Sequence, residues 1–233
     1  MSTVQGHVAI HRGGSFRGDT SLLGEMHALL VPSYCDPRSL LLREVEHCDT
    51  LYIARDADQC LSAFFLVAWE SLVVGGRPLP AVYMGLSAAR EDTKNTGQIR
   101  ELYAQFLGEA AEWQEATKQR LVLWFTTATP SAYLAAAALF GGLQPRTDGG
   151  YSVDSVLVAA SIRQRYYTSS SRPAHPFVLP NVAGDTRYSE SERDRIARVC
   201  ERKRFTLLAD LGVNESDGAR VWGRYKRGFS RGS

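Results

Sequence analysis

The chain has 233 residues and a formal net charge of +2, so it is long enough to bury one large core and carries no extreme charge. Its 44% hydrophobic and 22% charged residues are those of an ordinary globular protein. No apolar run approaches the roughly 20 residues that cross a bilayer, and residues 1–17 contain no apolar signal segment. These features exclude an integral membrane protein, and we expect a cytoplasmic one without a membrane partner.

The cysteines and histidines form no metal-binding pattern. The four cysteines contain no C-x-x-C pair and match no zinc signature, and the five histidines are scattered along the chain. We therefore expect free thiols in a reducing compartment and no metal site.

Charge is distributed unevenly along the sequence. Residues 1–160 contain 12 Lys and Arg against 17 Asp and Glu, a net of −5, whereas residues 161–233 contain 15 against 8, a net of +7. A basic segment of this kind is either a solvated helix face with a frayed end or a surface for a polyanion. The polyanions to consider are coenzyme phosphates, an acidic carrier protein and RNA.

The first 90 residues predict helices followed by a β-rich section. Helices are expected at residues 21–30 and 37–46, the second with Asp36 as N-cap and Pro37 at its first position. β-branched and aromatic residues predict further strands in this half. The strands expected are residues 7–11, 50–55, 61–74 and 81–88, with a loop at 75–80 that suggests an antiparallel pair.

The apolar period then becomes helical. Apolar residues between Ile99 and Trp113 predict a helix of about 20 residues, and the continuous apolar run 121–125 predicts a strand buried on both faces. The remaining elements expected are an alanine-rich helix at 131–140 ended by Gly141 and Gly142, a strand at 152–162, a helix at 191–208 and a strand at 219–226.

This order of elements predicts an α/β fold of the α+β type, with a mixed, largely antiparallel sheet and helices on both faces. Prolines prevent regular structure in residues 169–180. We therefore expect a core at residues 1–165 and a C-terminal extension at residues 166–233 that packs on the same core.

The most informative stretch is residues 81–100, where a strand ends, a polar loop follows and a long helix starts near Gly97. A helix N-terminus offers unpaired N–H groups and the positive end of the dipole, and glycine lets the backbone approach a ligand closely. Lys94, Asn95 and Thr96 would surround a pyrophosphate there. The alternative is ordinary helix capping, which Asn, Thr and Gly also serve.

Residues 50–162 resemble the core of the GNAT superfamily of acyltransferases. That family places a loop of the form [QR]-x-x-G-x-[GA] between a strand and a long helix; here Gly97 matches, Lys94 stands for Arg or Gln, and Ile99 replaces a small residue. A second family pattern, N-x-x-A-x-x-L-Y-x-x-x-G-F, places Thr129 at the Asn position. The family tyrosine of that pattern falls at Ala136.

The resemblance implies a set of coenzyme contacts and an open strand. In the family this strand splays from its neighbour, and one of its backbone N–H groups contacts the thioester carbonyl. Gly85 is compatible with a bulge in that strand. The coenzyme-binding residues implied are Leu86, Ser87, Ala88, Lys94, Asn95, Thr96, Gly97, Gln98, Ile99 and Thr129.

Two side chains are candidates for proton transfer. The family tyrosine often protonates the leaving thiolate; Tyr133, three residues before Ala136, is its candidate substitute, and a packing aromatic is the alternative. The strand at 83–89 contains no carboxylate. Glu70, in an otherwise apolar run, is the candidate base if burial tunes its pKa; the alternatives are an outward-facing residue and a water chain.

The resemblance implies an N-acyltransferase that moves an acetyl or other acyl group from acetyl-CoA or another acyl-CoA to an amine acceptor, a small molecule in the first hypothesis, without a metal. One alternative is a donor carried by an acidic carrier protein or tRNA, bound through the basic C-terminal region. Another is a non-catalytic GNAT-fold binding or regulatory protein. A nucleic-acid-associated protein unrelated to acyl transfer ranks last, because no RNA-binding signature is present. Homodimerisation is left open.

Overall fold

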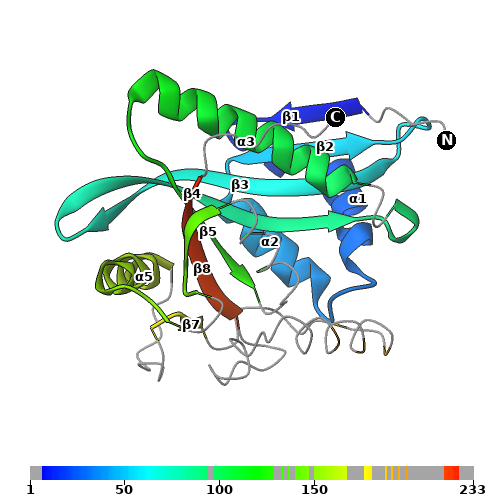
Figure 1. The fold of residues 1–233 in the computed structure, drawn as a ribbon. Helices are drawn as coiled ribbons and strands as arrows, with labels where there is room; N and C mark the ends of the chain where they lie inside the picture. The colour runs from blue at the N-terminus through cyan, green and yellow to red at the C-terminus, as the bar shows by residue number, and fades with distance from the viewer. Residues whose placement is uncertain are drawn as a thin grey trace. The chain divides into compact units, whose positions relative to one another are not determined.

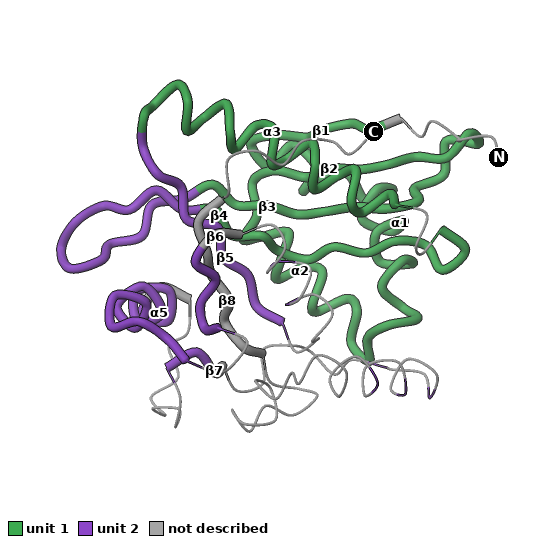
Figure 2. The backbone as a smooth tube through the Cα atoms, in the orientation of Figure 1, with its two compact units in different colours: residues 1–69, 82–118 green, residues 70–81, 119–233 purple. Residues whose placement is uncertain are grey.

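Figure 1 shows the fold of this computed structural model, which describes residues 7–93, 97–127, 140–146, 150–166, 176–179 and 218–225 and the single residues 133, 136, 187, 190, 194 and 198. The chain forms two compact units (Figure 2). Unit 1 contains Met1–Trp69 and Val82–Lys118, and unit 2 contains Glu70–Ala81 and Gln119–Ser233. The expected division at residue 165 stays a prediction, because most of residues 166–233 lie outside the described ranges.

Unit 1 is built on four strands in the order β1-β2-β3-β4. Their bounds are β1 His7–His11, β2 Thr50–Arg55, β3 Leu61–Val74 and β4 Arg77–Ala89. Strand β2 is antiparallel to both β1 and β3, and its Tyr52 lies opposite Ile10 on one side and Phe65 on the other. Strand β2 and residues 61–68 of β3 are almost wholly buried, as expected of runs rich in β-branched and aromatic residues.

The helices of unit 1 are η1 Ser15–Gly18, α1 Thr20–Leu30, α2 Pro37–His47, η2 Glu91–Thr93 and α3 Gln98–Thr117. Of these, α1 and α2 begin directly after aspartate N-caps. The carboxylate of Asp19 accepts a hydrogen bond from the Leu22 N–H, and that of Asp36 accepts one from the Ser39 N–H, which satisfies donors that the first turn leaves unpaired.

Helices cover both faces of the unit 1 sheet (Figure 1). On one face, α3 packs through aromatic rings. The ring centroids of Tyr103 and Phe65 lie 4.6 Å apart in an edge-to-face arrangement, and the ring of Phe106 packs against that of Tyr52. On the other face, α2 meets β4 where the Tyr83 hydroxyl bonds Glu44. The fold class expected from the sequence, α+β with a largely antiparallel sheet and helices on both faces, is confirmed.

Unit 2 contains the tip of the β3–β4 hairpin and a group of strands around β8. Its further elements are β5 Val122–Thr127, β6 Phe140–Gln144, α5 Val153–Tyr166, β7 Val178–Leu179 and β8 Gly218–Tyr225. Strand β8 is antiparallel to β5, β6 and β7. The hairpin turns at Gly75 and Gly76, whose φ angles of 57° and 77° favour glycine. The expected loop at 75–80 is therefore shorter, and residues 77–80 belong to β4.

One element prediction in unit 2 is wrong, and another, in which Tyr133 and Ala136 are helical as expected, differs at its C-terminal end. Residues 152–162, expected as a strand, form helix α5, in which Ser155, Val158, Ala159 and Ile162 are buried at helical spacing. A run of β-branched and small residues suggested a strand, but burial at intervals of three and four suits a helix. The expected helix at 131–140 ends earlier, because Phe140 begins β6 and Gly141 and Gly142 lie inside that strand.

Strand β7, at Val178–Leu179, falls within residues 169–180, where the prolines were expected to prevent regular structure. Strand β8 matches the strand expected at 219–226, and most of the helix expected at 191–208 lies outside the described residues. No helix among the described residues combines the length and apolar character needed to span a membrane.

Candidate active site on strand β4

Strand β4 breaks its regular alternation in the middle. The Tyr83 hydroxyl donates to Glu44 Oε2 on α2 at 3.0 Å, and a Cβ on Gly85 would lie 3.1 Å from the same oxygen. Ser87 Oγ instead lies 3.0 Å from the Tyr103 hydroxyl, which belongs to α3 on the opposite face. Residues 83, 85 and 87 of a regular strand share one face. The pleat is therefore interrupted between Gly85 and Ser87, as a bulge does.

Close packing around residue 85, rather than its backbone conformation, favours glycine at this position. A Cβ at this position would lie 3.0 Å from Cys48 Sγ and 3.2 Å from the Leu66 carbonyl oxygen, besides the Glu44 contact. Because one of these neighbours is main chain, a side chain here could fit only if the sheet moved. The glycine thus lets a carboxylate from α2 lie directly against the backbone of β4.

Glu44 is the only buried carboxylate among the residues that the structure describes. Burial raises the pKa of Glu44 above its ordinary value, because a carboxylate loses hydration in an apolar site. The hydrogen bond from the Tyr83 hydroxyl and the charge of Arg43 at 3.8 Å oppose this rise in pKa. A buried carboxylate whose pKa is raised above its ordinary value is a candidate proton acceptor.

The last turn of α2 is held in place from outside the helix. The Arg17 guanidinium donates to the carbonyl oxygens of Val45, Glu46 and Cys48 at 3.0 to 3.1 Å. These carbonyls lie at a helix C-terminus, where no helical partner is available, and a cation there also complements the helix dipole. Arg17 therefore fixes the turn that follows Glu44.

The opposite face of β4 contains a second polar pair. Ser87 Oγ and the Tyr103 hydroxyl are hydrogen-bonded, and burial raises the pKa of Tyr103 while the hydrogen bond with Ser87 lowers it. Leu86, Ser87 and Ala88, the three strand residues expected to contact a coenzyme, directly follow Gly85 and therefore lie at the interruption of the pleat. Leu86 is buried, and Ser87 and Ala88 are half-buried.

Helix α3 begins at Gln98, directly after Gly97. Gly97 is exposed and has a φ of 96°, which favours glycine, and it provides no side-chain cap. Gln98 and Ile99 occupy the first turn of α3. Of the other expected coenzyme contacts, Lys94, Asn95, Thr96 and Thr129 lie outside the described residues.

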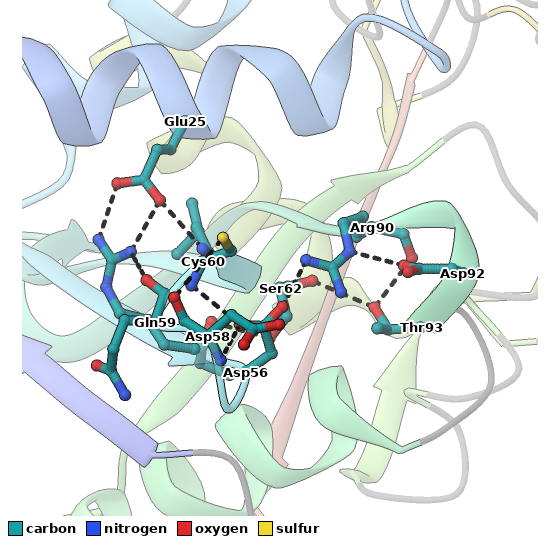
Figure 3. Close-up of polar contacts among 12 residues, drawn as sticks. Glu25, Asp56, Asp58, Gln59, Cys60, Ser62, Arg90, Asp92 and Thr93 are labelled. Atoms are coloured by element: carbon teal, nitrogen blue, oxygen red, sulfur yellow. Dashed lines mark hydrogen bonds and ion pairs between the residues drawn. The ribbon is translucent and has the colours of Figure 1, made fainter. Parts of the chain in front are cut away.

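A network of ion pairs anchors the segment that leads to this loop (Figure 3). Arg90 donates from Nη1 to Asp56 Oδ2 and from Nε to Asp92 Oδ1, both at 2.7 Å. The Thr93 hydroxyl contacts the carbonyl oxygens of Arg90 and Ser62. The end of β4 is thereby tied to the β2–β3 turn, and the positive charge of Arg90 is balanced by two carboxylates.

The two catalytic candidates from the sequence lie in unit 2. Glu70 is half-buried in β3, and its carboxylate accepts a hydrogen bond from Trp124 Nε1. Tyr133 is fully buried, and its hydroxyl donates to the Pro145 carbonyl oxygen. Their catalytic roles stay predictions. The described residues include no group of three or more His, Cys, Asp or Glu side chains that could hold a metal ion.

Sequence reasoning missed Glu44 because its neighbours Arg43 and Glu46 suggest an exposed helix face. A signal was nevertheless present. Leu40, Leu41 and Val45 form the buried face of α2. Glu44 follows Leu40 by four positions, which places its side chain on that same apolar face.

The chain was compared with known families, curated proteins and solved structures. No family model and no curated protein matches it. Solved structures do match. They include N-acetyltransferases of the GNAT family, the same superfamily that the sequence pattern resembles.

One match is the GNAT family N-acetyltransferase YhbS from Escherichia coli in complex with CoA, with 18% identity, a TM-score of 0.44 and coverage of 61% of this chain and 72% of that one. A probable N-acyltransferase from Enterococcus faecalis has 13% identity and a TM-score of 0.41 over 59% of this chain. A GCN5-related N-acetyltransferase from Kribbella flavida has 15% identity and a TM-score of 0.40 over 61%. The matched region spans 32% and 36% of these last two proteins.

Proposed function

We propose that this chain is a GNAT-type N-acyltransferase that moves an acetyl or other acyl group from a CoA-type thioester to an amine acceptor, a small molecule in the first instance. The observation that carries this proposal is the buried Glu44 carboxylate lying against the interrupted pleat of β4. The resemblance of residues 50–162 to the GNAT core supports it, because β4 is the strand that would receive the thioester.

The reaction needs an oxyanion donor and a proton acceptor. The amine nitrogen attacks the thioester carbonyl carbon, a C–N bond forms, and the C–S bond breaks to release the thiolate. The Leu86 backbone amide is the proposed donor to the developing oxyanion, and Glu44 is the proposed general base for the proton of the amine. Holding amine and thioester together contributes up to about 7–11 kcal/mol in well-oriented cases.

The coenzyme phosphates are proposed to bind at the start of α3. Gly97 offers a close backbone approach, and the first turn of the helix, with Gln98 and Ile99, offers N–H groups and a positive dipole end. Lys94, Asn95, Thr96 and Thr129 would complete this site, and the Arg90 network would hold the incoming segment.

The test separates coenzyme binding from chemistry. Calorimetry with CoA and acetyl-CoA is expected to give micromolar binding in the wild type and none in Gly97→Trp, whose side chain would block the phosphate approach. Thiol release from acetyl-CoA with a panel of primary amines then tests turnover. Glu44→Gln should retain acetyl-CoA binding and lose turnover, whereas Glu46→Gln, on the exposed face of the same helix, should retain both.

Glu70 and Tyr133 provide the competing assignments. If Glu70 is the base, Glu70→Gln will lose turnover and Glu44→Gln will not. If Tyr133 protonates the leaving thiolate, Tyr133→Phe will lower thiol release without weakening acetyl-CoA binding. Coenzyme binding without thiol release for any amine would instead favour a non-catalytic binding protein.

A macromolecular acyl donor is the second candidate function. The net charge of +7 in residues 161–233 favours it, because an acidic carrier protein or a tRNA would be attracted there. Neutralising Arg202, Lys203 and Arg204 together should then lower activity with such a donor and make that activity less sensitive to salt. Unchanged activity would leave free acyl-CoA as the donor.

A further inference from the structure

The polar pair on the α3 side of β4 holds a proton that none of the described residues accepts. Ser87 Oγ and the Tyr103 hydroxyl lie 3.0 Å apart, and within the described ranges each has the other as its single hydrogen-bond partner. Each hydroxyl carries one proton, and their mutual hydrogen bond uses only one of the two. The pair therefore retains one O–H group that can donate to a ligand.

The chemistry of the two hydroxyls favours Ser87 as the owner of that proton. Either oxygen can be the donor at this distance. A phenol is more acidic than an alcohol and is the better donor, so Tyr103 donates to Ser87 Oγ. The ring of Tyr103 is held by Phe65 of β3, edge to face, with centroids 4.6 Å apart. Ser87 is half-buried and follows Gly85 by two positions, so its hydroxyl lies at the interruption of the pleat.

The two faces of β4 offer different groups to the proposed reaction. Glu44 and Tyr83 meet on the α2 face, whereas Ser87 and Tyr103 meet on the α3 face. The coenzyme phosphates are proposed to bind at the start of α3, so the arm that carries the sulfur is expected to run along the α3 face. The leaving sulfur would then meet the spare hydroxyl, while the amine would lose its proton on the other face.

We infer that the Ser87 hydroxyl donates a hydrogen bond to the thioester sulfur as it leaves, and that Tyr103 is the positioning residue that keeps this proton free. The inference rests on the proposed function and deepens it. When the C–S bond breaks, its electron pair stays on the sulfur, and the Ser87 O–H stabilises the negative charge that develops there. Ser87 keeps its proton, and the released thiolate takes one from water.

The first test is Ser87→Ala, which should lower kcat and retain the affinity for acetyl-CoA measured by calorimetry. The sulfur of an intact thioester is a weak acceptor, so the donor acts mainly in the transition state. The loss in kcat should be about 10- to 100-fold, as expected for one hydrogen bond to a charged group. Ser87→Thr keeps a hydroxyl and should recover most of the activity. Tyr52→Phe, which removes a hydroxyl from β2 beneath the same helix, is the control and should retain kcat.

The second test changes the leaving atom. A selenolate is a better leaving group than a thiolate and needs less stabilisation, so the selenoester analogue of acetyl-CoA depends less on the hydroxyl. Formation of the acylated amine is measured with both donors in the wild type and in Ser87→Ala. The variant should lose much more activity with the thioester than with the selenoester. Equal losses with the two donors would overturn the inference, because the hydroxyl would then act elsewhere than on the leaving atom.

The positioning role of Tyr103 is tested by a double-mutant cycle. Tyr103→Phe should lower kcat less than Ser87→Ala does, and it should have no further effect in the Ser87→Ala background, because it acts through Ser87. Losses that multiply in the double variant would overturn this role. Unchanged kcat in a Ser87→Ala protein that binds acetyl-CoA overturns the inference and leaves the proposed function standing. A wild type that acylates no amine overturns the proposed function itself.

Discussion

Two groups of carboxylates in unit 1 balance their charge in different ways. At the β2–β3 turn, Glu25 pairs with Arg55 at 2.8 Å and Asp56 with Arg90 at 2.7 Å. Hydrogen bonds from these arginines lower the pKa of both acids. Next to β4, Glu44 of α2 has the Arg43 guanidinium at 3.8 Å, and burial raises the pKa of Glu44.

The difference separates a structural role from a chemical one. An acid whose pKa is lowered by a guanidinium stays ionised throughout the neutral range and serves to tie elements together. An acid whose pKa is raised by burial holds its proton to a higher pH than an exposed acid, and such perturbed acids are candidates for proton transfer. Under the proposed function, the turn network positions the α3 loop and Glu44 accepts the proton of the amine.

The largest expected effect is on turnover. Glu44→Gln keeps the shape of the side chain and removes the base, so kcat for thiol release should fall by about 10²- to 10⁴-fold. Asp56→Asn, in the turn network, should change kcat far less, because it alters only the anchoring of the loop. Comparable losses in the two variants, measured with the same amine, would contradict the distinction between the groups.

Gly85→Ala should act on both stability and activity. The added methyl meets Cys48 Sγ, Glu44 Oε2 and the Leu66 carbonyl at 3.0 to 3.2 Å, and such overpacking lowers the free energy of unfolding by about 1–3 kcal/mol. Gly24→Ala in α1 is the matched control, because nothing lies within 4 Å of its Cβ position. Alanine is the better helix former, so this control should be stabilised by up to about 1 kcal/mol. Urea unfolding measures both, and equal stabilities would exclude the crowding at Gly85.

Arg17→Ala tests how firmly the turn after Glu44 is held. It removes the donor to three carbonyl oxygens at the end of α2. The free energy of unfolding should fall by about 1–2 kcal/mol, since the guanidinium is largely exposed and its hydrogen bonds are partly screened. Arg38→Ala on the exposed side of α2 is the control, and its unfolding midpoint should stay close to that of the wild type.

The elements that the sequence predicted correctly are those whose signals lie within a few residues of one another in the chain. Asp36 with Pro37, and the apolar stripe from Ile99, fixed α2 and α3 to within a residue or two, because caps and periodicity act within one turn. Helix α5 was mistaken for a strand, since a short apolar run fits either period. The Glu44 site depends on α2 meeting β4 across distant parts of the chain, and nothing near Glu44 in the sequence records that its neighbour is Gly85.

The pH dependence of stability should have opposite signs in the two groups. The folded state raises the pKa of Glu44, so its contribution is present at low pH and is lost as pH rises from the unfolded pKa of about 4.3 through the folded value. The folded state lowers the pKa of Asp56, so its contribution is present above about pH 4 and is lost as pH falls through the folded value. Relative to the wild type, the free energy of unfolding of Glu44→Gln should increase as pH rises. The free energy of unfolding of Asp56→Asn should be lower than that of the wild type near neutral pH, and this difference should disappear as pH falls. Thermal unfolding from pH 3 to 8 measures both, and slopes of the same sign would refute the contrast.

The most direct test of the central claim is the pH profile of kcat for thiol release from acetyl-CoA in the wild type and in Glu44→Gln. The account predicts that wild-type activity falls on the acid side with an apparent pKa above the ordinary value for glutamate, and that the residual activity of the variant lacks this limb. An identical acid limb in both proteins would show that another group accepts the proton, and Glu44 would then be only a buried contact between α2 and β4.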